Sequence, residues 1–287
     1  MKLNVVDEFD WLSTHVDGRS VSYVRVGRGQ PLVLLHGFTL GHSTLTYGPS
    51  IAPLAKHFDV IVPDLPGYGS SDPLPGVYST ESYIHFLEGF LDALALEEVC
   101  LVGFSKGGAI SLGFTLHYPE RVSKLVLVSS YALSGAVHVP LLPYLALRTP
   151  GLAQVVWRSL RSVKGLLPLY LKNLVFGDAD NVTDKLIAEI REPLSKEGSE
   201  QAFMTWMRGE MGPLHLKTNY ADRLPELRTP TLLLHGTKDL VVPARRAKRA
   251  ADLIPNVHLE LLRGCGHWVP REAPERFVDT LRTFLEP

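Results

Sequence analysis

With 287 residues, 45% of them hydrophobic, the chain is long and apolar enough to form one large buried core. Lysine and arginine number 29 against 30 for aspartate and glutamate, and because the net charge of −1 provides no general attraction for phosphate groups, we expect neither a nucleic acid nor a membrane as a partner. Only two cysteines occur and no segment is typical of a signal peptide or a membrane span, so we expect a cytoplasmic protein without a disulfide framework.

In chain order, the predicted elements begin with a hairpin, because Asp17-Gly18 separates two runs of alternating polarity. Short apolar runs then predict strands that are buried on both faces, at 31–37, 58–67, 99–105, 124–130 and 230–236. Helix-like segments alternate with them, at 50–56, 79–96, 107–117, 243–253 and 274–285. This alternation predicts an α/β fold with a mostly parallel, doubly wound sheet, to which the hairpin adds an antiparallel edge.

The alternation stops between residues 131 and 213, where prolines punctuate helical segments and no strand-like run occurs. We therefore expect residues 1–130 and 214–287 to form a core domain and residues 131–213 to form an inserted helical domain. Every methionine except Met1 lies in this insertion, and the spacing of Met204, Met207 and Met211 predicts one helix face. That face either packs on the core or lines a substrate pocket with its flexible apolar side chains.

The stretch "VGFSKGG", residues 102–108, matches the pattern G-x-S-x-G where a predicted strand runs directly into a predicted helix. Such a turn is so tight that the residues beside its central serine can barely carry side chains, and Gly103, Gly107 and Gly108 provide the room. The pattern is typical of a nucleophile elbow, which presents a serine Oγ at the carboxyl end of the sheet. Ser105 is therefore the candidate nucleophile.

A neutral serine needs a histidine as base and an acid to orient that histidine. Asp239 follows the strand "TLLLHG" by a few residues, and His267 lies in a glycine-containing loop before the last predicted helix. The order Ser105, Asp239, His267 is the one expected for this architecture. His36 and His235 each precede a glycine at a strand end, where we expect structural roles.

Negative charge that develops on a carbonyl oxygen needs hydrogen-bond donors, which are usually backbone N–H groups. Lys106, directly after the nucleophile, and Phe38, in the loop after the first parallel strand, are the candidates. The Lys106 side chain has several possible places. It either extends to solvent, pairs with a carboxylate, or faces the pocket and favours anionic substrates.

Six motifs in sequence order, "LLHGF", "PDLPGYGSSD", "LVGFSKGGA", "HYPERVSKLVLVSS", "LHGTKDLVVP" and "CGHWVPREAPERF", resemble the α/β-hydrolase superfamily along essentially the whole chain. The resemblance implies the same three catalytic residues and the same pair of oxyanion donors. It also implies that residues 131–213 form a lid or cap, and that the enzyme needs no cofactor and no metal. The apolar and aromatic composition of the cap favours a mostly apolar small-molecule substrate, with Met204, Met207, Met211 and Trp268 as candidate contacts.

Several reactions are compatible with this resemblance. Haloalkane dehalogenases and epoxide hydrolases of this fold have an aspartate where Ser105 stands, so ester hydrolysis through an acyl-serine is the leading hypothesis. Meta-cleavage-product hydrolases, which cleave C–C bonds, are the alternative because they share the serine triad and often a "CGHW" like residues 265–268. The stretch "HGFTLG" and Lys106 depart from their pattern. A perhydrolase or acyltransferase would use the same acyl-serine with another acceptor. A noncatalytic ligand receptor is a further alternative, but all three triad positions here hold residues that can perform catalysis.

Overall fold

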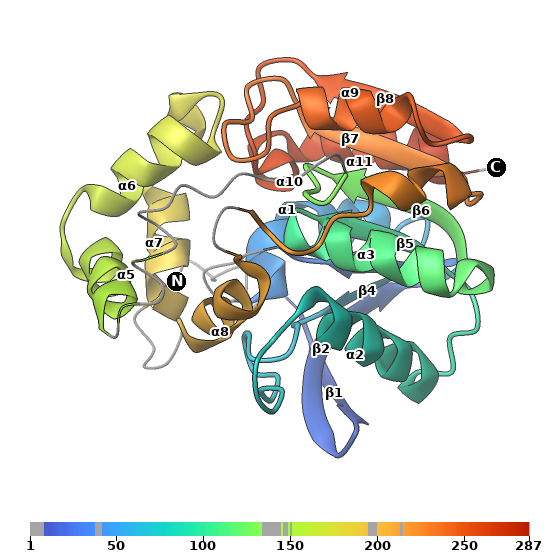
Figure 1. Cartoon of the computed structure of the whole chain (residues 1–287), viewed down its shortest axis with the longest axis horizontal. Helices are drawn as coiled ribbons and strands as arrows, with labels where there is room; N and C mark the ends of the chain where they lie inside the picture. Colours follow the sequence, from blue (N-terminus) through green and yellow to red (C-terminus); the bar gives the residue numbers. More distant parts are fainter. Residues whose placement is uncertain are drawn as a thin grey trace.

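The structure, a computed structural model, describes residues 9–37, 42–133, 145, 149, 151–194, 200–212 and 215–286, and within them an eight-stranded sheet forms the centre (Figure 1). Its strands follow the order β1-β2-β4-β3-β5-β6-β7-β8. Their bounds are β1 Trp11–Val16, β2 Arg19–Gly27, β3 Pro31–Leu35, β4 Asp59–Pro63, β5 Val99–Phe104, β6 Val122–Val128, β7 Thr231–Gly236 and β8 Val257–Leu262. The pairings of β1 with β2 and of β2 with β4 are antiparallel, and the other pairings are parallel. The predicted fold class is confirmed.

The hairpin of β1 and β2 turns at the predicted dipeptide. Asp17 and Gly18 both have positive φ, 50° and 75°, and Val16 pairs with Arg19 across the turn. Two successive residues with positive φ match the right-handed twist of the strands, and aspartate and glycine are among the residues that adopt this conformation most readily.

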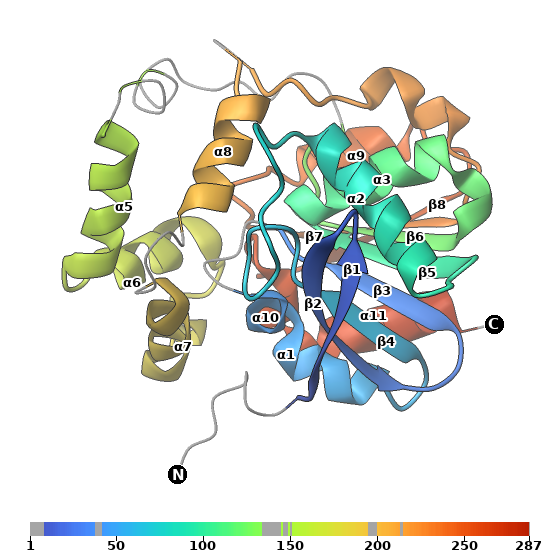
Figure 2. The same cartoon turned by 90° about the horizontal axis from the view of Figure 1, so that it is seen from below.

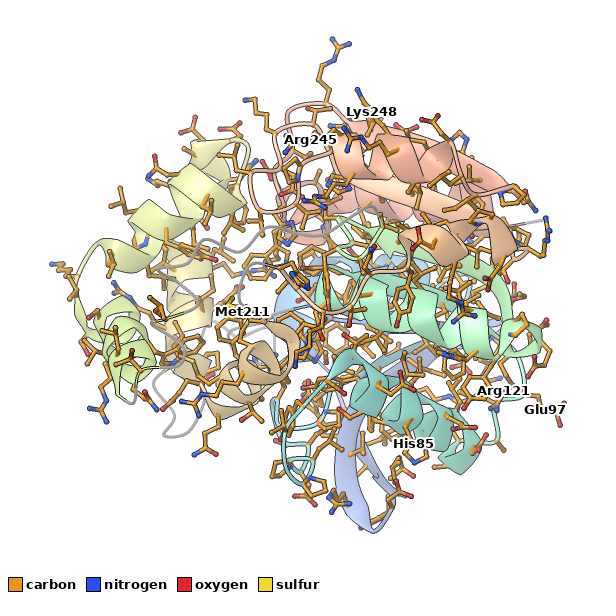
Figure 3. All side chains as sticks on the ribbon, in the orientation of Figure 1. His85, Glu97, Arg121, Met211, Arg245 and Lys248 are labelled. Atoms are coloured by element: carbon orange, nitrogen blue, oxygen red, sulfur yellow. The ribbon has the colours of Figure 1, made fainter. Side chains whose placement is uncertain are left out.

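Helices cover both faces of the sheet (Figure 2). The core helices are α1 Ser43–Leu54, α2 Thr80–Ala93, α3 Lys106–His117, α9 Arg245–Ala251, α10 Val269–Glu272 and α11 Pro274–Leu285. One buried cluster joins Val33 and Leu35 to α2, α3 and α9, whereas the other joins Leu32 and Leu34 to α1 and α11. Neighbouring residues of β3 thus face opposite layers, as the two-residue period of a strand requires. On α9, Arg245 and Lys248 lie on the outer side (Figure 3).

Helix α1 is longer than predicted, because it begins at Ser43 rather than at residue 50. Pro49 and Pro53 lie inside it, and each removes one backbone donor. The predicted helix at 50–56 already contained Pro53, so what the sequence analysis missed is the part from Ser43 to Pro49. Burial of Leu45 and Ile51 between the sheet and α11 compensates for the missing hydrogen bonds.

Between β6 and β7 the chain forms the inserted helices, which stand to one side of the sheet (Figures 1 and 2). They are α5 Leu152–Ser162, α6 Leu166–Tyr170, the π-helical turn η3 Leu171–Val175, α7 Asp184–Leu194 and α8 Gln201–Glu210. Helix α8 reaches both layers of the core, since Trp206 belongs to the cluster of α2 and α3 and Met204 to the cluster of α1 and α11. That residues 131–213 are a separate domain stays a prediction.

Candidate active site

Ser105 lies in the turn between β5 and α3, with φ 53° and ψ −110°. A non-glycine residue in this region is strained, and such strain persists only where the surroundings determine the conformation. They do so here, because a Cβ on Gly107 would strike the carbonyl oxygens of Leu35 and His36, and one on Gly103 would strike Gly107. The glycines of the motif are thus required by the close approach of neighbouring backbone, as the sequence indicated.

His267 reaches this turn from the loop that follows β8. Its Nε2 lies 3.0 Å from Ser105 Oγ, and its Nδ1 lies 2.8 Å from Asp239 Oδ2. An ionised carboxylate can only accept, so Nδ1 carries the proton and Nε2 is left to accept from the serine hydroxyl. The backbone N–H of His267 donates to the carbonyl oxygen of Val175, at 2.7 Å, which places the loop against the inserted helices.

Asp239 lies in the loop after β7 and is buried. Its Oδ1 accepts hydrogen bonds from the N–H groups of Val241 and Val242, at 2.9 and 2.7 Å. Burial alone would raise the pKa of this carboxyl, but attraction to His267 and hydrogen bonds from His235 and His267 outweigh it and hold the pKa well below its usual range. Asp239 is therefore ionised at neutral pH and directs its negative charge at the His267 ring.

His235 has a part in this arrangement that the sequence did not indicate. Its Nε2 lies 2.7 Å from the carbonyl oxygen of Val242 and 3.1 Å from Asp239 Oδ2. Since both neighbours only accept, Nε2 carries a proton and donates to them. The expected structural role is thus more specific, because His235 holds the carboxylate that orients His267. A histidine four residues before the candidate acid was the available signal.

Of the two candidate oxyanion donors, Lys106 lies among the described residues and Phe38 does not. Lys106 is the first residue of α3, where a backbone N–H has no acceptor within the helix. Phe38 lies outside the described residues. The residue before it, Gly37, lies beside Ser105, since a Cβ on Gly37 would be 2.8 Å from Ser105 Cβ. Both donor assignments stay predictions.

The Lys106 side chain does not reach solvent, and no carboxylate in the described part of the chain pairs with it, so these residues contradict both interpretations. It is 1% exposed, and its Nζ lies 4.2 Å from the ring centre of Tyr68, 4.3 Å from that of Tyr83 and 5.7 Å from that of Trp206. We call these three rings the aromatic cage. Burial holds the pKa of the Lys106 amine well below its usual value.

The three methionines do not share one helix face. Helix α8 ends at Glu210, and Met211, labelled in Figure 3, lies beyond it. Met211 pairs with Leu216 in a short antiparallel bridge. Met204 and Met207 pack against different core clusters. Trp268 follows His267 and meets the Phe176 ring edge to face, at 6.0 Å between centres. A role of these side chains in substrate binding stays a prediction.

A buried carboxylate missed by the sequence reasoning, that of Glu272 in α10, ties the His267 loop to the inserted helices. Its Oε2 accepts from the N–H of Gly266, at 2.7 Å, and its Oε1 accepts from the N–H groups of Gly177 and Asp178, both at 2.9 Å. A glutamate in a short polar helical segment carries no sequence signal for such a role.

In the described part of the chain, no helix is both long enough and apolar enough to cross a membrane. The same described residues hold no group of three or more histidine, cysteine, aspartate or glutamate side chains that could bind a metal ion.

Comparison with known proteins gives a consistent result. A family model described as the alpha/beta hydrolase fold matches residues 30–274. A 2-hydroxy-6-oxo-2,4-heptadienoate hydrolase of Pseudomonas putida is 33% identical over 270 residues, which cover 91% of this chain and 90% of the relative. A meta-cleavage product hydrolase from Pseudomonas fluorescens superposes with a TM-score of 0.78 at 28% identity, covering 97% of this chain and 98% of its own. An esterase from Thermogutta terrifontis has the same TM-score at 25% identity, covering 96% of this chain and 98% of its own.

Proposed function

The chain belongs to the α/β-hydrolase family, and from this premise we propose that it is a serine hydrolase that cleaves carboxylic esters through an acyl-serine intermediate. The observation that carries the proposal is the continuous chain of hydrogen-bonding atoms from Ser105 Oγ through the His267 ring to Asp239, with distances of 3.0 and 2.8 Å. A noncatalytic ligand receptor has no need of a strained serine aligned with a base and an ionised acid.

In the proposed mechanism, His267 Nε2 takes the proton of Ser105 Oγ while the oxygen attacks the ester carbonyl carbon. The backbone N–H groups of Lys106 and Phe38 hold the resulting oxyanion, each worth about 3 kcal/mol of the barrier. Asp239 stabilises the imidazolium. The alcohol leaves with the proton from Nε2, and water, deprotonated by the same nitrogen, then attacks the acyl carbon and releases the acid and free Ser105. The protein's own groups supply nucleophile, base and acid, so the reaction needs no cofactor.

We further propose that residues 131–213 act as a cap over the nucleophile, with Met204, Met207, Met211 and Trp268 as substrate contacts. Two basic side chains close in sequence to Ser105 and His267 are largely buried. Lys106 is enclosed by the aromatic cage, and Arg271 pairs with Glu189. Because an anionic substrate needs a cation to replace its water, this arrangement favours small neutral, mostly apolar esters.

Hydrolysis of C–C bonds in meta-cleavage products is the second candidate. It is supported by the names of the relatives, among them the dienoate hydrolase that is 33% identical. The same serine would attack a ketone carbonyl, and the carbon leaving group would then have to be protonated. The occupied Lys106 and the stretch "HGFTLG" argue for esters instead.

The test is a substrate panel of p-nitrophenyl esters of increasing chain length, lactones and a chromogenic meta-cleavage product. We expect the esters to be cleaved fastest and Ser105→Ala to abolish turnover, together with covalent labelling by a fluorophosphonate. The exposed Ser162 provides a matched control, since Ser162→Ala should retain both. Faster cleavage of the meta-cleavage product would reverse the order of the two candidates, and turnover by Ser105→Ala would exclude both.

A further inference from the structure

The Lys106 amine is buried without a polar partner. Among the described residues, no atom accepts a hydrogen bond from its Nζ, although the side chain is only 1% exposed. An ammonium ion in this setting has lost its water and gained no counter-ion, so the ring faces of the aromatic cage are left to stabilise the charge. A methionine or leucine would fill the same space at lower cost, which raises the question of what the amine does.

The aromatic cage is built from two parts of the molecule. Tyr68, in the loop after β4, and Tyr83, in α2, belong to the core, whereas Trp206 belongs to α8 of the inserted helices. Trp206 is itself buried and meets the ring of Tyr131 edge to face, at 5.8 Å between centres. Lys106 is thus the residue whose backbone follows Ser105 and whose side chain touches α8.

We propose that Lys106 is a positioning residue, which joins the placement of α8 over the site to the turn that holds Ser105 and the amide after it. This inference rests on the proposed function. With Trp206 in place, the aromatic cage clamps the side chain and with it the first turn of α3. When α8 moves away, as a cap must for substrate to enter, Nζ is left open to water on the side that Trp206 covered.

The two environments bind different numbers of protons. In the closed form, burial lowers the pKa of the Lys106 amine, whereas a hydrated amine in the open form has its ordinary pKa of about 10.4. At a pH between the pKa of the closed form and that of the open form, the open form holds one proton more on Lys106. Closing therefore releases a proton. Closure is therefore favoured as pH rises, by up to about tenfold in its equilibrium constant per pH unit.

The other titratable groups around the aromatic cage do not reproduce this behaviour. They are His36, Tyr68, Tyr78, Tyr83, Tyr131 and Glu210. Burial, with a contribution from the Lys106 charge, lowers the pKa of His36 to about 3, and burial raises the pKa of each of the four tyrosines. Glu210 is held by Thr80 Oγ1, at 3.0 Å, and by the N–H of Thr218, at 2.6 Å.

The first measurement is the pH profile of kcat/KM for a neutral ester. In the wild type we expect it to keep rising on the alkaline side, by up to about tenfold per pH unit. Lys106→Met keeps the volume of the side chain and removes the proton, so its profile should level off. Lys124→Met is the matched control, because Lys124 Nζ binds the carbonyl oxygens of Phe284 and Leu285 away from the site and this variant should keep the wild-type slope.

A second measurement needs no activity. The unfolded chain holds the Lys106 proton more tightly than the folded one, so the contribution of Lys106 to wild-type stability rises with pH until about pH 10.4. The difference in Tm, Lys106→Met minus wild type, should therefore fall as pH rises. It should become independent of pH in a Trp206→Leu background, where the aromatic cage is open. This result stands or falls separately from the reaction that Ser105 performs.

Two outcomes would overturn the proposal. One is a Tm difference for Lys106→Met that stays constant with pH, which would show that the amine does not lose its proton on folding. The other is an alkaline slope of kcat/KM that survives in Lys106→Met, because another group would then control closure. If the wild type showed no Ser105-dependent turnover but the Tm difference still changed with pH, the proton release of Lys106 would stand and the proposed function would be rejected.

Discussion

The turn around Ser105 and the inserted helices are built under opposite constraints. At Gly103 and Gly107 an added Cβ would collide with backbone, whereas at Gly151 and Gly165, which precede α5 and α6, no atom of the described residues lies within 4 Å. Large apolar side chains on the inserted helices also face outward, among them Leu152, Val155, Val163, Leu169 and Leu174. Neighbouring backbone confines the first region, while the second leaves open space at these two glycines and exposes part of its apolar side chains.

This difference indicates which parts of the molecule can change. Geometry that must hold a nucleophile within hydrogen-bond reach of its base tolerates little displacement. If the inserted helices cover an apolar substrate, as we propose, their sequence can vary more widely. The two regions are joined through Trp206, Glu210 and Glu272, and each of these joins inserted helices to core by a buried contact. The experiments below test whether chemistry and stability follow this division.

The largest effect is expected at Asp239. Asp239→Asn keeps the shape of the side chain but leaves His267 in the wrong tautomer, so kcat should fall by about 10⁴-fold. Steady-state kinetics on a short-chain ester measures the loss, and circular dichroism checks that the fold is retained. Asp252→Asn, at an exposed position after α9, should leave kcat unchanged. A loss of less than tenfold at Asp239 would mean that the acid does not orient the base.

Alanine substitutions compare the two regions directly. Gly107→Ala would place a Cβ 2.7 Å from the carbonyl oxygen of His36 and closer still to that of Leu35, and it should lower the free energy of unfolding by about 3 kcal/mol. Gly165→Ala meets no neighbour and should cost about 1 kcal/mol for its positive φ alone. Urea unfolding of both variants measures the two costs. Equal costs would show that the close backbone contacts at Gly107 do not constrain the turn more than the open surroundings of Gly165 constrain the insertion.

Glu272 tests the contact between the regions. In Glu272→Gln an amide group replaces one carboxylate oxygen and faces backbone donors, so we expect a loss of about 2 kcal/mol in the free energy of unfolding. Because Gly266 precedes His267, kcat should also fall, by roughly tenfold for a small displacement of the base. The exposed Glu275, changed to glutamine, should alter neither quantity. An unchanged kcat in Glu272→Gln would confine the role of Glu272 to stability.

The smallest effect concerns the proposed substrate contacts. Met207→Ala should lower kcat/KM for a hexanoate ester roughly fivefold relative to the acetate, since about 1 kcal/mol of apolar contact is lost only with the longer chain. Met211, another proposed contact, lies beyond the end of α8, and Met211→Ala should lower the ratio of hexanoate to acetate hydrolysis in the same direction. If both variants give the same ratio of hexanoate to acetate hydrolysis as the wild type, the insertion does not contact the acyl chain.

Much of the core could be predicted because its signals are local. A buried strand that runs into glycines around a serine indicates the elbow, and every predicted strand is present. Ser105, Asp239 and His267, predicted from turns at strand ends, are brought together. The first turns of α1, from Ser43 to Pro49, were missed because a proline inside a helix removes a hydrogen bond, a loss that burial of the helix outweighs.

The sequence by itself determined the succession of strands and turns along the chain, because backbone conformation depends on neighbouring residues. It therefore also determined which side chains follow the strands at the carboxyl edge of the sheet. Only the tertiary structure decided the surroundings of Lys106, His235 and Glu272. The partners of Lys106 and Glu272 come from distant parts of the chain, as when Trp206 covers an amine a hundred residues before it. Whether a charged side chain is hydrated or buried depends on what packs over it, and no local pattern records that.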